Sequence, residues 1–256
     1  MRPLPALSGK RVVITRPGGQ AENLARLVRE AGGKPLCVPA IEILPLADPA
    51  AFHAVAKRLA GFDLAIFVSR NAVRSALALL AGTPWPAGLK VATVGQGSQE
   101  ELEQRGFTGV IAPAAQSDSE ALLALPALAA VRGRRIVIFR GDGGRKLLGD
   151  ELGKRGAVVE YAACYRRVRP EARAGLDEAW AGGVDAVTVS SAEGLVNFLQ
   201  MLGEQRVQRM REIPVFVPHS RVAEDAARRG LQRVIVAGPR DAEMFAALAA
   251  HFGGAR

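Results

Sequence analysis

The chain has 256 residues, of which 49% are hydrophobic and 23% charged, a composition typical of a globular protein with about two domains. No apolar run reaches the roughly 18 residues of a membrane span. The N-terminus does not resemble a secretion signal, so we expect a soluble protein of the cytoplasm. The formal net charge of +9 suits an anionic partner, although a solvated basic surface would explain it equally well.

Composition also argues against metal and nucleotide chemistry. Cys37 and Cys164 do not form a CxxC pair, and the three histidines are scattered along the chain, so no metal-ligand cluster is predicted. The Gly95-x-Gly97 turn lacks the third glycine of a dinucleotide-binding fingerprint. We therefore expect a protein that works without a metal or another cofactor.

Short apolar runs alternate with helical periodicity along the first half of the chain. In chain order we expect a strand at 11–15, a helix at 20–31, a strand at 64–68, a helix through 73–80, a strand at 91–94, a helix ending at 106 and a strand at 110–111. Two intervening segments, 35–46 and 158–169, look extended and are predicted to cross between domains.

The second half of the chain repeats the first at a nearly constant offset, which is evidence of duplication. The matching pairs are 9–16 (GKRVVITR) with 133–140 (GRRIVIFR), 61–69 with 183–191, and 106–111 with 230–235. Strands that alternate with helices at this spacing predict parallel sheets covered on both faces. The predicted fold class is α/β, with two similar doubly wound, flavodoxin-like domains.

Small and polar residues follow most of the predicted strands. Ligands of parallel α/β sheets bind at the carboxyl ends of strands, where glycines allow close approach and helix N-termini attract anions. The candidate binding residues are Thr15, Arg16, Ser69, Asn71, Gly95, Ser98, Arg140, Gly141, Ser190, Ser191, His219 and Ser220. The alternative is ordinary capping, because Ser69, Ser98 and Ser191 stand where helix N-caps are expected and a lone loop histidine is commonly a surface residue.

The chain contains two tyrosines, Tyr161 and Tyr165, and both fall in the second extended crossing. They are either half-buried packing residues of an amphipathic edge strand or, if this crossing lines a cleft, groups that present a phenol to a substrate.

Several short motifs, taken together and in order, resemble the uroporphyrinogen-III synthase family over nearly the whole chain. They are 15–17 (TRP), 39–43 (PAIEI), 67–73 (FVSRNAV), 94–98 (VGQGS), 138–141 (IFRG) and Tyr165. The resemblance implies two domains joined by a two-stranded antiparallel hinge. Residues 1–34 and 170–256 would form one domain, 47–157 the other, and 35–46 with 158–169 the hinge, so the repeat would be swapped between domains.

The resemblance further implies a monomeric, cofactor-independent lyase that cyclises hydroxymethylbilane with loss of water and inversion of ring D, in the cleft between the domains. This substrate carries eight carboxylates, which accords with the basic chain. Tyr165 matches the tyrosine proposed as proton donor in the family. Val222 occupies the place of a family threonine, so Ser220 or His219 would have to replace its hydroxyl.

Two other classes of function, a non-catalytic binding protein and a nucleic-acid-binding protein, are alternatives to this enzyme. A non-catalytic, two-lobed binding protein for an anionic small molecule is the main alternative. Nucleic-acid binding would also use the basic charge, but aromatic residues make up only 5% of the chain and no recognition motif occurs, so no nucleic-acid partner is predicted.

Overall fold

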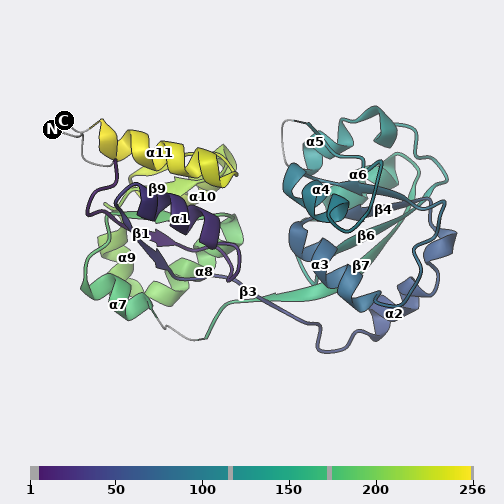
Figure 1. Cartoon of the computed structure of the whole chain (residues 1–256), viewed down its shortest axis with the longest axis horizontal. Coiled ribbons are helices and arrows are strands. Elements are labelled where there is room, and N and C mark those ends of the chain that lie inside the picture. The colour runs from purple at the N-terminus through teal and green to yellow at the C-terminus, as the bar shows by residue number, and fades with distance from the viewer. Residues whose placement is uncertain (1–5, 115–117, 172–174, 255–256) are drawn as a thin grey trace. The chain divides into compact units, whose positions relative to one another are not determined.

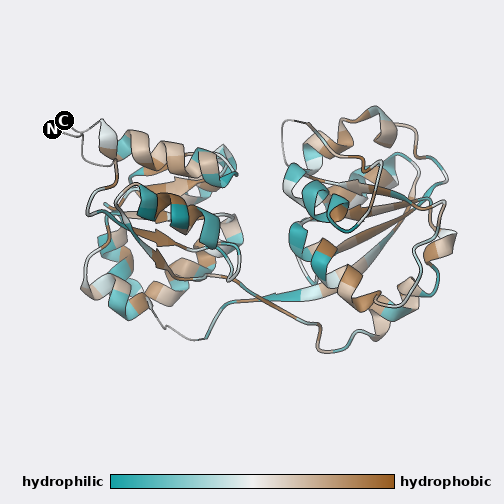
Figure 2. Cartoon of the chain, viewed as in Figure 1, coloured by the Kyte–Doolittle hydropathy of each residue, from teal (hydrophilic) through white to brown (hydrophobic). Residues whose placement is uncertain are grey.

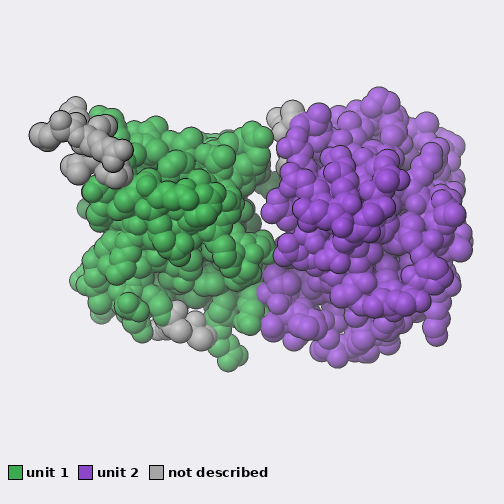
Figure 3. All heavy atoms as spheres, in the orientation of Figure 1, with its two compact units in different colours: residues 1–42, 168–256 green, residues 43–167 purple. Residues whose placement is uncertain are grey.

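The computed structural model describes residues 6–114, 118–171 and 175–254. The chain forms two compact units (Figures 1 and 3), one of residues 1–42 with 168–256 and one of residues 43–167. Each contains a five-stranded sheet dominated by parallel pairs, with helices on both faces, and the predicted α/β fold class is confirmed. Among the described helices, none combines the length and apolar character needed to cross a bilayer.

Unit 1 (residues 1–42 and 168–256) has the strand order β10-β9-β8-β1-β2, and every pair in it is parallel. Its strands are β1 (Arg11–Ile14), β2 (Lys34–Cys37), β8 (Ala186–Thr188), β9 (Val215–Val217) and β10 (Val234–Val236). Its helices are α1 (Glu22–Glu30), α7 (Leu176–Ala181), α8 (Ala192–Leu202), α9 (Glu204–Met210), α10 (Ser220–Arg228) and α11 (Asp241–Gly253).

Unit 2 (residues 43–167) has the strand order β3-β7-β6-β4-β5. The pairs β7–β6, β6–β4 and β4–β5 are parallel. Its strands are β3 (Glu42–Leu44), β4 (Leu64–Phe67), β5 (Lys90–Thr93), β6 (Arg135–Gly141) and β7 (Val158–Val168). Its helices are α2 (Ala50–Ala56), α3 (Arg70–Leu79), α4 (Gln96–Glu103), α5 (Ser119–Leu123) and α6 (Leu147–Lys154), with short 3-10 turns at Leu59–Gly61 and Pro126–Leu128.

Burial on both faces of each sheet explains why the central strands are continuous apolar runs. In β1, Val12 and Ile14 pack in the core beside α1 and α11, whereas Val13 points into the opposite core beside α8. In β6, the neighbouring residues Ile138 and Phe139 likewise pack in opposite cores of unit 2. Figure 2 shows most strands of both units as apolar ribbons, although part of β7 is hydrophilic, and the helices also carry hydrophilic segments.

The duplicated segments of the sequence lie in opposite units. β1 comes from the first half of the chain but pairs with β8, and β6 comes from the second half but pairs with β4. Each half of the chain therefore contributes its first strand and helix to the unit that the other half completes.

Two details of the chain differ from the sequence expectations. Val110 and Ile111 do not form a strand, because only Ile111 bridges to Ala92 of β5 and Pro113 follows, which has no N–H for a ladder. The segment 158–168 is more than a crossing, since β7 pairs with β6 along most of its length and lies between β6 and β3. β7 is therefore an interior strand, and the edge-strand interpretation of its tyrosines is wrong.

Candidate functional site

Each sheet has one position at which the strand order changes direction. In unit 1, β1 leads outward to β2 while β8 leads the other way to β9 and β10, so the change lies between β1 and β8. In unit 2 it lies between β6 and β4 by the same reasoning. Ligands of open α/β sheets bind outside the carboxyl ends of the strands at such positions.

Three predicted residues of unit 2 meet at its switch point. Ser69 follows β4, Gly141 ends β6, and Tyr165 lies in β7 opposite Gly141. The Tyr165 side chain is only 3% exposed, and its hydroxyl lies 3.3 Å from the Ser69 Oγ. The sequence indicated each residue separately, and the fold places them side by side.

The backbone around Gly141 explains why the Tyr165 ring occupies this position. The β6–β7 register shifts between Arg140 and Gly141, so that Gly141 rather than a larger residue faces Tyr165. A Cβ on Gly141 would lie 2.9 Å from Tyr165 Cε2 and 3.1 Å from Cζ, closer than packed carbon atoms allow. The amide of Asp142 donates a hydrogen bond of 2.9 Å to the Tyr165 carbonyl oxygen, which fixes the strand at the same point.

Ser69 occupies this place because it caps α3. Its backbone is extended, and its Oγ accepts a hydrogen bond of 3.1 Å from the Ala72 amide, as an N-cap serine does. The capping prediction for Ser69 is therefore confirmed. Asn71 is the second residue of α3 and is half-buried. The positive end of the α3 dipole thus lies beside the Tyr165 hydroxyl.

Arginines surround the glycine-rich turn that follows β6. The Arg140 guanidinium donates to the carbonyl oxygens of Gly143 and Arg145, and its Cζ lies 4.9 Å from the centroid of the Tyr161 ring. The Arg167 amide donates to Asp142 Oδ1 at 3.3 Å. This turn therefore combines positive charge with backbone that a ligand can approach closely, features suited to a carboxylate.

The turn after β5 differs from the sequence expectation. Gly95, not Ser98, is the N-cap of α4, and Ser98 lies within the helix with 6% of its surface exposed. The capping prediction for Ser98 is wrong, because the extended backbone at Gly95 starts the helix one turn earlier. Gly97 leaves room for the Arg70 guanidinium, which a Cβ at that position would overlap.

In unit 1, Thr15 and Arg16 follow β1 at the second switch point. Thr15 is buried, and its hydroxyl donates to the Thr188 carbonyl oxygen at 2.9 Å, a bond that joins the ends of β1 and β8. The Arg16 guanidinium forms an ion pair of 2.9 Å with Asp241 at the start of α11. Both side chains therefore take part in structural contacts of unit 1.

The remaining predicted residues of unit 1 follow β8 and β9. Ser191 caps α8, since its Oγ accepts from the Gly194 amide at 3.0 Å, and its capping prediction is confirmed; Ser190 beside it is partly exposed. His219 and Ser220 are exposed at the start of α10, and His219 makes no side-chain capping bond. Val222, at the place of the family threonine, is buried in the apolar core below them.

Two buried titratable groups of unit 2 were not among the residues predicted to have a role. Burial raises the pKa of the Cys164 thiol to about 12, and the thiol donates to the Arg140 carbonyl oxygen, so Cys164 is an inert packing residue beside Tyr165. Hydrogen bonding from Arg74, assisted by Arg105, lowers the pKa of Glu101 on α4. Neither position carries a local sequence signal, because both roles depend on tertiary neighbours.

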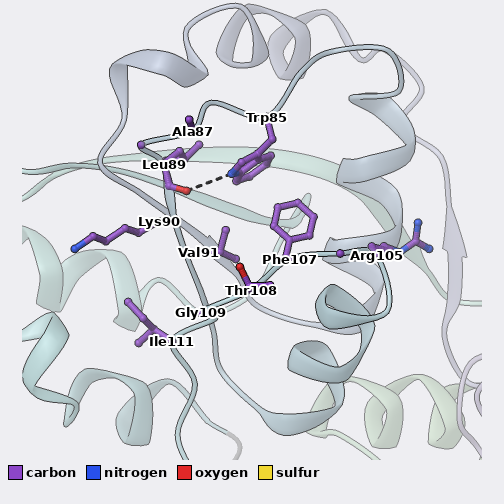
Figure 4. A pocket seen from close by; sticks show the side chains of 12 residues that line it. Trp85, Ala87, Leu89, Lys90, Val91, Arg105, Phe107, Thr108, Gly109 and Ile111 are labelled. Atoms are coloured by element: carbon purple, nitrogen blue, oxygen red, sulfur yellow. Dashed lines mark hydrogen bonds between the residues drawn. The ribbon is translucent and has the colours of Figure 1, made fainter.

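A cavity of about 830 Å³ lies elsewhere in unit 2, at the amino end of β5 (Figure 4). The Trp85 and Phe107 rings meet edge-on there, and the Trp85 indole donates to the Leu89 carbonyl oxygen at 3.2 Å. None of the predicted site residues lines this cavity. Among the described residues, no group of three histidine, cysteine or acidic side chains is placed to hold a metal ion.

Comparison with known proteins agrees with this geometry. The family profile described as "Uroporphyrinogen-III synthase HemD" matches residues 22–246, most of the chain. The chain belongs to the uroporphyrinogen-III synthase family. A uroporphyrinogen-III synthase of Salmonella typhimurium is 33% identical over 90% of this chain and 96% of its own length. The Escherichia coli uroporphyrinogen-III synthase is 31% identical over the same shares.

Solved uroporphyrinogen-III synthases share the fold. A mutant enzyme from Thermus thermophilus aligns with a TM-score of 0.64 at 18% identity, over 93% of this chain and 96% of that one. The enzyme from Helicobacter pylori aligns with a TM-score of 0.59 at 14% identity, over 93% and 97%. The two-unit α/β architecture is therefore that of solved uroporphyrinogen-III synthases.

Proposed function

We propose that this protein is a uroporphyrinogen-III synthase that cyclises hydroxymethylbilane with loss of water and inversion of ring D. The family membership and the two relatives above 30% identity support this function. The structural observation that carries its chemistry is the phenol of Tyr165, held beside Ser69 at the switch point of unit 2.

Tyr165 is the proposed proton donor. In the first step the bond between the terminal methylene carbon and its hydroxyl breaks, and the Tyr165 proton leaves with that hydroxyl as water. The pyrrole nitrogen stabilises the cation that remains. Ring D then attacks this carbon through its substituted position and forms a spiro intermediate. A positioned acid typically accelerates such a departure by about 10²- to 10⁴-fold.

The remaining work is positioning, since the uncatalysed closure gives the wrong isomer. The turns at the carboxyl ends of the strands are the proposed carboxylate sites, because they combine helix N-termini with basic side chains. In unit 2 they are formed by Asn71, Gly95, Ser98, Arg140 and Gly141, together with the backbone of Ser69. In unit 1 they are formed by Thr15, Arg16, Ser190, His219 and Ser220, together with the backbone of Ser191. Of these, His219 and Ser220 are exposed at the start of α10, where a ligand can reach their side chains.

Incubation of the purified protein with hydroxymethylbilane tests the function. The products are oxidised to uroporphyrins and separated by isomer. We expect the type III isomer in excess over the type I product that forms without enzyme. Type I product alone, at the uncatalysed rate, would contradict the proposal and favour a binding protein for an anionic small molecule.

We also propose that the protein acts as a monomer in the cytoplasm, without a nucleic-acid partner. Its two cysteines are unpaired, as is usual in a reducing compartment. Sedimentation of the purified protein, with and without duplex DNA at physiological salt, would test the monomeric state and the absence of a nucleic-acid partner through the observed mass.

A further inference from the structure

We propose that Ser69 is a positioning residue for Tyr165, whose hydroxyl it orients and whose ionised form it stabilises, in addition to capping α3. This inference rests on the proposed function, because it concerns Tyr165 as proton donor. It assigns to Ser69 a role that acts through another residue and not through contact with a substrate carboxylate.

The hydrogen-bond capacity of Ser69 leads to this role. A serine hydroxyl has one proton to donate and two lone pairs to accept with. The Ala72 amide occupies one lone pair at 3.1 Å, which leaves the hydroxyl proton for an acceptor. The Tyr165 oxygen lies 3.3 Å away, and either hydroxyl can donate to the other. When Ser69 donates, the Tyr165 proton is directed to another acceptor, such as the departing hydroxyl of the substrate.

Proton transfer makes the same contact stronger. The O–H bond of Tyr165 breaks as a new O–H bond forms on the leaving hydroxyl, so the phenol oxygen becomes an anion that only accepts hydrogen bonds. Ser69 donates to that anion, and hydrogen bonds to charged groups are stronger than neutral ones. The N-terminus of the ten-residue helix α3 adds a favourable dipole at the same place. The arrangement thus favours the state in which the proton has been given away.

The internal repeat separates this role from capping. Ser191 is the repeat counterpart of Ser69, with the same extended backbone, and its Oγ accepts from the Gly194 amide at 3.0 Å. Both tyrosines of the chain lie in β7 of unit 2, so Ser191 has no tyrosine beside it in unit 1. Capping alone therefore explains Ser191, whereas Ser69 makes one contact more.

The experiment compares Ser69→Ala with Ser191→Ala in a Tyr161→Phe background, where Tyr165 is the sole tyrosine. The absorbance change on phenol ionisation then reports on Tyr165 alone. We expect Ser69→Ala to raise the titration midpoint of Tyr165 by about one pH unit. We also expect it to lower kcat roughly tenfold at unchanged KM, because no substrate contact is removed.

Matched variants distinguish positioning from structural loss. Ser191→Ala removes an equivalent cap and should leave the Tyr165 midpoint unchanged. Ser69→Thr keeps both the cap and the hydroxyl, and should restore the midpoint and kcat. If Ser69→Ala does not fold, Ser69→Gly serves instead, because glycine is tolerated at N-caps with little loss of stability.

The outcomes separate this inference from the function on which it rests. An unchanged Tyr165 midpoint and kcat in Ser69→Ala, in a protein that Tyr165→Phe impairs, would overturn the role of Ser69 alone. A rise in KM at constant kcat would also overturn it, since that result indicates direct substrate binding. Full activity of Tyr165→Phe would instead refute the proposed chemistry of Tyr165.

Discussion

At the residue scale, the proposed chemistry of Tyr165 depends on its hydroxyl group, whereas its ring packs in the apolar core. Tyr165→Phe removes this oxygen and keeps the apolar packing of a side chain that is 3% exposed. We expect turnover to fall by about 10²-fold or more, with little change in the midpoint of thermal unfolding. The rate of type III isomer formation measures the effect. Tyr161→Phe is the matched control, and equal rates in the two variants would remove Tyr165 from the mechanism.

Glycine is required at position 141 because the Tyr165 ring packs against it, and not because of its backbone angles. A methyl group there would meet the Tyr165 ring at 2.9 Å, so the ring would have to shift and its 3.3 Å contact with Ser69 would be disturbed. Gly141→Ala should therefore reduce kcat about tenfold or more, since small displacements of a catalytic group are costly. Gly153→Ala on α6, where a Cβ meets nothing within 4 Å, is the control for steady-state kinetics. Activity equal to that of the control would show that the ring position is not critical.

At the element scale, the contact between α3 and α4 includes one buried carboxylate, beside the exposed ion pair of Arg70 with Glu100. Glu101 accepts hydrogen bonds from Arg74 of α3 at 2.9 Å and from Arg105 at 3.1 Å. The Glu101 side chain is 10% exposed, and removal of its charge leaves two guanidiniums without their partner. Glu101→Gln should lower the free energy of unfolding by about 1 to 3 kcal/mol at neutral pH.

The lowered pKa of Glu101 determines how the difference in free energy of unfolding between wild type and Glu101→Gln depends on pH. A carboxyl whose pKa is lower in the folded state stabilises the protein above its unfolded pKa and loses that effect as pH falls through its folded pKa. The difference in free energy of unfolding between wild type and Glu101→Gln should be largest near pH 7 and decrease below about pH 4. Urea denaturation at a series of pH values measures it. The exposed Glu100→Gln is the control, and a gap that grows in acid would contradict the ion-pair account.

The sequence predicted elements better than it predicted contacts. The strands β1 and β4 are short apolar runs buried on both faces, so their composition identified them, whereas β6 was indicated by its match to the segment of β1. Ser98 was misplaced because two glycines precede it and either residue type can begin a helix. The contact between Ser69 and Tyr165 joins residues 96 apart and depends on the register shift at Gly141, for which no local sequence signal exists.

At the scale of the whole molecule, the two units differ in how the chain builds them. Both apolar cores of unit 2 consist entirely of residues between 43 and 167, one uninterrupted segment. Unit 1 combines residues from both ends of the chain, and its interior strand β1 comes from the first of these segments.

We therefore expect a fragment of residues 43–167 to fold alone, with a cooperative urea transition followed by circular dichroism. Residues 168–256 alone should not fold, because β8 would lack β1 and the core beside α1 would be open. Addition of a peptide of residues 1–42 should restore helical signal to that second fragment. A non-cooperative transition for 43–167 would show that its stability depends on the rest of the chain.

The position of β1 between β8 and β2 also determines the order in which a nascent chain can fold. β1 and β2 leave the ribosome first, but β8 follows only after all of residues 43–167 have been made. Until then one edge of β1 has no ladder partner from its own sheet, an exposure that favours aggregation. Unit 2 can therefore be completed before unit 1, and β1 must remain unpaired on that side until β8 (Ala186–Thr188) has been made.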